Sequence, residues 1–152
     1  MPLQLQDAEQ ELIAAEAEYF ASRVNNPAAQ AAYSRLQQAA LEGSLEDDLL
    51  EVLGGLLEIG LSSGRIRSVH SAHGEMAAAS LFRRTPQGRA LQFQFTEANQ
   101  AFAALQGQTI ESVSFSAQGP GLYTLTVKTG EARVVTQLKP SGIEVRSVEV
   151  SL

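Results

Sequence analysis

The side chains with the greatest chemical potential gather in one segment, residues 65–89. It contains both histidines of the chain, His70 and His73, and Glu75 follows closely. Two imidazoles three residues apart face the same side of a helix, which makes them half of a metal site or a candidate general base. A third ligand is missing, because Glu75 points elsewhere on such a helix. We therefore predict no metal site and no cofactor.

The same segment is the most basic part of the chain. Guanidinium groups bind phosphates and carboxylates through paired hydrogen bonds, so a binding site for an anionic ligand near the two histidines is one hypothesis. The favoured alternative is that these cations pair with acidic helices, within the chain or between subunits. The five arginines are Arg65, Arg67, Arg83, Arg84 and Arg89.

Charge is divided unevenly along the sequence. Residues 1–60 hold eleven acids and two arginines, a net charge of −9, whereas residues 61–152 carry a net charge of +3. Blocks of opposite sign indicate an interaction surface or pairing inside the fold. The total charge of −6 argues against a nucleic-acid partner, since such a partner needs a basic surface.

Other patterns typical of enzymes are missing from the sequence. The absence of cysteine excludes a disulfide scaffold, a thiolate zinc site and a cysteine nucleophile. Neither a G-x-S-x-G motif nor a phosphate-binding glycine loop occurs. We assign no catalytic residue, and our first hypothesis is a non-enzymatic protein–protein interaction or assembly subunit. The alternative is a small enzyme or an anionic-ligand-binding domain.

Composition indicates a bacterial cytoplasmic protein. Nine arginines against two lysines, with abundant alanine, are typical of a GC-rich bacterial genome. The first residues show neither the basic nor the apolar segment of a signal peptide. No apolar run reaches the roughly 18 residues that a membrane helix needs, so we expect no membrane segment.

Hydrophobic periodicity predicts about four helices in residues 1–85. Asn26 followed by Pro27 marks the start of the second helix, and Gly43 marks its end. Ser44 is expected to cap the third helix. The four helices are expected at residues 7–25, 27–42, 45–61 and 68–84.

The third of these helices carries more apolar side chains than a solvent-facing helix needs. It is therefore either central in the core or an interface between subunits. Gly54 and Gly55 in its middle predict close packing against a neighbouring helix, with a kink as the alternative. The candidate interface residues are Leu49, Val52, Leu53, Leu56 and Ile59.

A further helix is expected at residues 86–106, because Thr85 and Pro86 form a start signal and apolar residues then recur at helical spacing. The alternation of Leu91, Phe93 and Phe95 leaves a strand followed by a shorter helix as the alternative.

The rest of the chain predicts four strands joined by short turns, a four-stranded antiparallel β-meander. A bulge is expected near Ser147. One face of the sheet is polar, so the other is expected to pack on the helix at 86–106. The whole chain is thus an α+β protein in a single domain, residues 1–152. The residues expected on the apolar face include Val113, Phe115, Tyr123, Leu125, Val127, Val134, Leu138, Ile143 and Val145.

Overall fold

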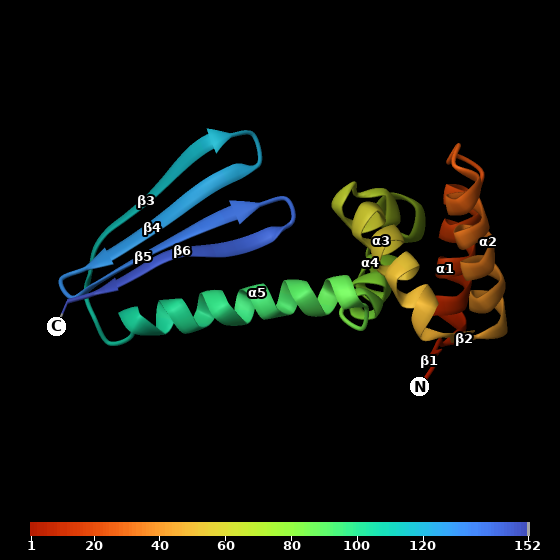
Figure 1. Cartoon of the computed structure of the whole chain (residues 1–152), viewed down its shortest axis with the longest axis horizontal. Helices are drawn as coiled ribbons and strands as arrows, with labels where there is room; N and C mark the ends of the chain where they lie inside the picture. Colours follow the sequence, from red (N-terminus) through yellow and green to blue (C-terminus); the bar gives the residue numbers. More distant parts are fainter. Residues whose placement is uncertain (152) are drawn as a thin grey trace. The chain divides into compact units, whose positions relative to one another are not determined.

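The computed structural model describes residues 1–151 and has the expected α+β architecture. Its contacts divide the chain into two compact units, Met1–Arg89 and Ala90–Leu152. The first unit is helical and the second is built around a four-stranded antiparallel sheet (Figure 1). The boundary falls inside helix α5, Pro86–Phe102.

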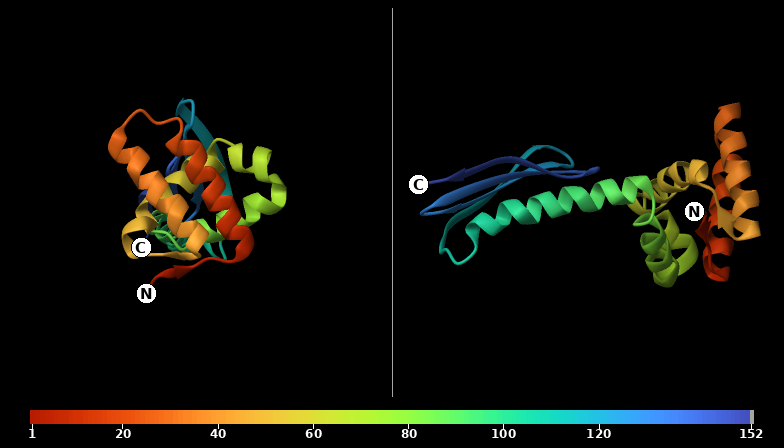
Figure 2. Two further views of the ribbon diagram at one scale, coloured as in Figure 1. Left: turned by 90° about the vertical axis from the view of Figure 1, so that its right-hand side faces the viewer. Right: turned by 60° about the horizontal axis from the view of Figure 1, so that its bottom comes forward.

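Four helices build the helical unit. Helices α1 and α2 lie side by side in both views (Figures 1 and 2). Helix α1 ends four residues before the predicted position. The helices are α1 (Asp7–Ala21), α2 (Pro27–Glu42), α3 (Asp47–Ser62) and α4 (Arg65–Phe82).

Helix α2 begins and ends as its sequence predicts. The Asn26 side chain accepts hydrogen bonds from the backbone N–H groups of Ala28 and Ala29, and Pro27 occupies the first turn. Gly43 ends the helix in the left-handed conformation, with a φ of 84°. That conformation is accessible to glycine without the steric penalty that a Cβ brings.

The prediction that Ser44 caps the third helix is wrong. Helix α3 starts at Asp47 after Glu46, while Ser44 and Leu45 form the short strand β2. Strand β2 pairs antiparallel with strand β1, Leu3–Gln4, some forty residues earlier in the chain. Backbone pairing with this distant strand outweighs the local capping preference of serine.

The core of the helical unit is made of aliphatic side chains from all four helices and from Leu45. Each buried leucine or isoleucine contributes roughly 1.5–3 kcal/mol relative to an exposed one. The largest fully buried apolar side chains are Ile13, Leu36, Leu45, Leu53, Leu56, Leu57, Ile66 and Leu81.

The predicted close packing of α3 is confirmed at Gly54 but not at Gly55. A Cβ on Gly54 would overlap the side-chain oxygen of Gln87, whose Nε2 donates to the Glu51 carbonyl. A Cβ on Gly60 would lie 2.6 Å from the Cδ1 atom of Ile66. Gly55, in contrast, has open space around it.

Helix α4 differs from the predicted helix in its start and in its continuity. It begins at Arg65, three residues early, and is broken at Ser71, where φ is 68° and ψ is 178°. This is a strained backbone conformation for a residue with a side chain. The break lies between His70 and His73, so the two imidazoles are not held on one helical face.

The second unit contains a meander in the order β3-β4-β5-β6, each pair antiparallel, as expected. The chain reaches it through α5, which is helical throughout the ambiguous segment, and the 3₁₀ turn Ala103–Leu105. Thr85 caps α5, because its hydroxyl accepts a hydrogen bond from the Gly88 N–H. The strands are β3 (Ile110–Gly119), β4 (Leu122–Thr129), β5 (Ala132–Lys139) and β6 (Gly142–Val150).

The predicted bulge is also present. Val135 lies opposite Ser147 and Thr136 lies opposite Val145, so Arg146 is the extra residue of β6. This register keeps the apolar side chains of β6 on the same face before and after the bulge.

Helix α5 covers only part of the apolar face of the sheet. Ala98 and Ala101 of α5 are buried, as are Val134 and Ile143 of the sheet. Strand β3 lies at the edge farthest from β6 and is exposed from Ile110 to Gln118. The expectation that the helix shields the whole apolar face is therefore wrong for β3.

Candidate functional site

The arginine and histidine segment forms an ion-pair cluster around Glu16 of α1. The carboxylate of Glu16 is fully buried and accepts hydrogen bonds from Nε and Nη2 of Arg65, at 2.9 and 3.3 Å. Nε2 of His70 lies 2.8 Å from the same carboxylate. The Arg65 guanidinium also stacks on Tyr19, 3.1 Å from the ring centroid. These contacts compensate the buried negative charge of Glu16 inside the fold.

The other cations of the segment divide between ion pairs and solvent. Arg84 donates to Glu9 at 3.0 Å, and Arg67 lies 3.4 Å from Glu75. Arg83 and Arg89 are exposed and have no ion pair within residues 1–151. The pairing of basic residues with an acidic helix of the same chain is thus confirmed for Arg65 and Arg84.

These contacts leave little of the predicted ligand site. His70 faces Glu16, whereas His73 is exposed beyond the break at Ser71. Glu75 is engaged with Arg67. Among the described residues no group of three potential ligands is close enough to hold a metal ion.

The candidate interface on α3 is largely internal. Leu49, Leu53 and Leu56 are buried in the core of the helical unit, and Val52 is half-buried. Only Ile59 is exposed. Three of the five side chains are therefore occupied by contacts within their own chain.

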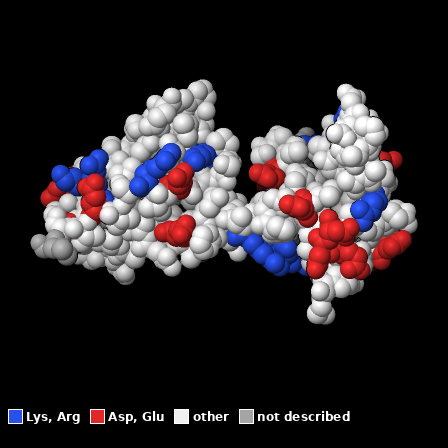
Figure 3. All heavy atoms as spheres, in the orientation of Figure 1, with Lys and Arg blue, Asp and Glu red and all other residues white. Residues whose placement is uncertain are grey.

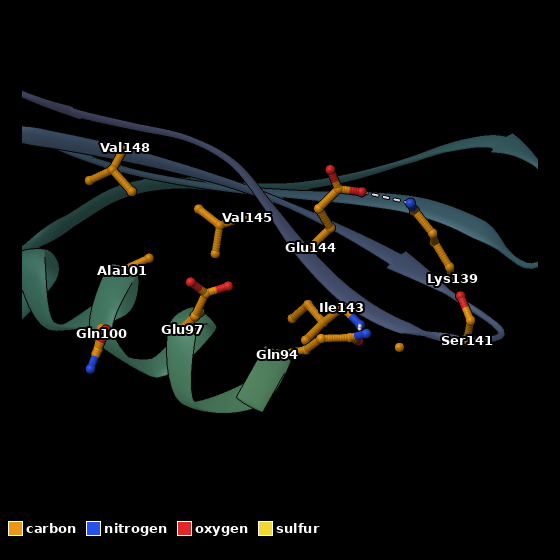
Figure 4. Close-up of a pocket in the computed structure, with 11 residues that line it drawn as sticks. Gln94, Glu97, Gln100, Ala101, Lys139, Ser141, Ile143, Glu144, Val145 and Val148 are labelled. Carbon is orange, nitrogen blue, oxygen red and sulfur yellow. Dashed lines mark hydrogen bonds and ion pairs between the residues drawn. The ribbon is translucent and has the colours of Figure 1, made fainter. Parts of the chain in front are cut away.

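A groove lies between α5 and β6, with a volume of about 760 Å³ (Figure 4). Val145 and Val148 of β6 point toward α5, which contributes Glu97 and Ala101 to the lining. At its end the Gln94 side chain accepts a hydrogen bond from the Ile143 N–H. Its lining mixes apolar and polar side chains. Ser141 and Lys139 are of nucleophile types, but the lining holds no histidine that could activate the serine, and Lys139 is bound to Glu144.

Glu144 at the rim of this groove is held ionised by two cations. A hydrogen bond from Lys139, at 2.6 Å, and the positive charge of Arg146 lower the pKa of Glu144 below its ordinary value of 4.5. The stabilisation from this ion pair is present above pH 4.5 and is lost as the pH falls through the lowered pKa.

Replacing Lys139 with methionine is expected to raise the pKa of Glu144 toward 4.5, because the strongest stabilising contact of the carboxylate is removed. An NMR titration of the side-chain carboxyl carbon measures this change. The control is Asp48 in the helical unit, whose pKa is lowered by the hydrogen bond from Arg35, and Lys139→Met should leave its titration unchanged. An unchanged Glu144 titration would contradict the assigned contact.

The most unusual surface of the molecule is the free edge of β3. Between Ser112 and Gln118 the strand contains no charge and no proline, and serines alternate with Val113, Phe115 and Ala117. Val113 and Phe115 are 55% and 67% exposed. In the face shown in Figure 3, the upper part of the β3–β4 hairpin is free of charged side chains.

The opposite edge of the sheet is protected. Strand β6 carries Glu144, Arg146 and Glu149, and its bulge interrupts regular pairing. Charges and bulges are the usual devices that keep an edge strand from pairing with another chain. Strand β3 lacks charges along its middle and is ten residues long, with register shifts only near its two ends. It is therefore an accessible edge for backbone pairing.

The sequence signal for this edge is visible in retrospect, because seven successive residues without charge or proline are uncommon on an exposed strand.

Comparison with known proteins finds no family model, no curated protein and no solved structure that matches the chain. Within residues 1–151 no helix is long and apolar enough to cross a membrane.

Proposed function

We propose that this protein is a non-enzymatic assembly subunit that binds a protein partner through strand β3. The exposed, uncharged edge of β3 is the observation that carries the proposal. An added strand would pair with the free N–H and C=O groups of β3, and its side chains would contact Val113 and Phe115. The arginine- and alanine-rich composition is typical of a GC-rich bacterial genome, and we propose the bacterial cytoplasm as the place of this role.

Two features support an interaction over catalysis. The His70 and Arg65 side chains are engaged with Glu16, so they serve the fold. Strand β3, in contrast, presents apolar side chains to solvent with no visible role inside its own unit. Exposed apolar patches of this kind mark protein interfaces.

Photo-cross-linking in the cells that make the protein tests this proposal. Replacing Phe115 with benzoylphenylalanine is expected to yield adducts heavier than the 16.2 kDa chain. The matched control places the same cross-linker at Phe93 of α5, which is 63% exposed against 67% for Phe115. Adducts specific to position 115 support the proposal. No adduct at position 115, or equal adducts at both positions, overturns it.

A further inference from the structure

We propose that the partner is a second copy of this chain, and that two β3 strands pair antiparallel with Ser114 on the two-fold axis. This inference rests on the proposed function and specifies its partner. The result is one continuous sheet made of two four-stranded meanders. A two-fold axis makes the same patch meet itself, so the patch must be self-complementary.

The sequence of β3 meets that requirement in a register centred on Ser114. With Ser114 opposite Ser114 of the second copy, Val113 of each chain lies opposite Phe115 of the other. Aromatic and β-branched residues are favourable cross-strand neighbours. On the other face Ser112 lies opposite Ser116, where two hydroxyl groups can form a hydrogen bond. A register centred on Val113 would instead place Glu111 against Phe115.

Charge also favours a second copy at this edge. The chain has a net charge of −6, so two copies repel each other overall. Residues 112–118 carry no charge, and the self-paired register brings no like charges opposite each other. At the β6 edge, by comparison, Glu144 and Glu149 would approach their own counterparts in at least some registers. Two copies can therefore approach each other more readily at the β3 edge than at the β6 edge.

The exposed apolar surface at this edge favours pairing. The exposed parts of Ile110, Val113, Phe115 and Tyr123 amount to on the order of 400 Å². Edge pairing covers the backbone groups of β3 and the flanks of its side chains, whereas the two faces of the sheet stay open. Because the two-fold axis is perpendicular to the sheet, the uncovered apolar faces of both β3–β4 hairpins become continuous.

A single cysteine at position 114 tests the register, since the chain has no cysteine of its own. Directly opposite residues in antiparallel strands have Cα atoms about 4.5–5.5 Å apart. This separation lies within the range of about 4.4–6.8 Å that a disulfide spans. Purified Ser114→Cys is expected to form a disulfide-linked dimer under mild oxidation. The control is Glu149→Cys, which is also exposed but lies on the opposite edge strand and is expected to stay monomeric.

Light scattering of the purified protein tests the dimer without a disulfide. The wild-type chain is expected at twice 16.2 kDa. Val113→Lys is expected to return the mass to one chain, whereas Val150→Lys is expected to leave it doubled. The two valines are 55% and 54% exposed and lie on opposite edge strands, so both variants should keep the wild-type circular dichroism spectrum.

The outcomes separate this inference from the proposed function. A monomeric wild-type protein, a dimer that survives Val113→Lys, or faster cross-linking at position 149 than at 114 overturns the β3–β3 dimer. Adducts of another protein at position 115 in cells, with a monomeric purified chain, would leave the proposed function standing and reject the second copy as partner.

Discussion

Replacing Glu16 with alanine is expected to destabilise the protein by about 3 kcal/mol, because it leaves the Arg65 charge and the His70 ring without their shared partner. The carboxylate is fully buried, and the Arg65 side chain is only 24% exposed, so water replaces the lost contacts poorly. Urea unfolding followed by the helical circular dichroism signal at equilibrium measures the change.

Glu18 provides the matched control for this substitution. It lies on the same helix and is exposed, so Glu18→Ala is expected to change the unfolding free energy by less than about 0.5 kcal/mol. Equal effects of the two substitutions would contradict the structural role assigned to Glu16. A double-mutant cycle with Arg65→Ala isolates the energy of the pair, and the two effects should not add.

Replacing Gly88 with alanine is expected to destabilise the protein by about 3 kcal/mol. A Cβ at this position would overlap the carbonyl oxygen of Phe82 and would lie 2.9 Å from the Cα atom of Arg83. Both neighbours are backbone atoms, which cannot turn away as a side chain can. The clash therefore outweighs the roughly 1 kcal/mol that alanine gains over glycine in a helix. Chemical denaturation provides the measurement.

Gly55→Ala is the opposite-sign control. Gly55 lies inside α3 with no atom within 4 Å of an added Cβ, so alanine is expected to stabilise the protein by roughly 0.5–1 kcal/mol. A loss of stability at Gly55 comparable to that at Gly88 would show that the steric explanation is wrong.

Local signals in the sequence account for much of the fold. Asn26-Pro27 and Thr85-Pro86 mark helix starts because a cap acts within one turn of its own position. Gly43 marks a helix end because glycine adopts the left-handed conformation readily. The alternation of residues 110–150 likewise establishes the strands, their turns and the two faces of the meander.

The residues of the candidate sites come together only in the tertiary structure. Glu16 and Arg65 are 49 positions apart, and Leu3 pairs with Leu45, so no local pattern assigns either partner. The strained break at Ser71 separates two histidines that their spacing alone would place together.

Local patterns also do not determine which apolar faces are buried and which are exposed. Hydrophobic spacing placed Leu53 and Val113 on apolar faces, yet the structure buries the first and exposes the second. Periodicity determines which side of a helix or strand a residue occupies, because that depends on backbone geometry alone. Whether that side is covered depends on where distant segments pack, and only the three-dimensional arrangement of the chain decides it.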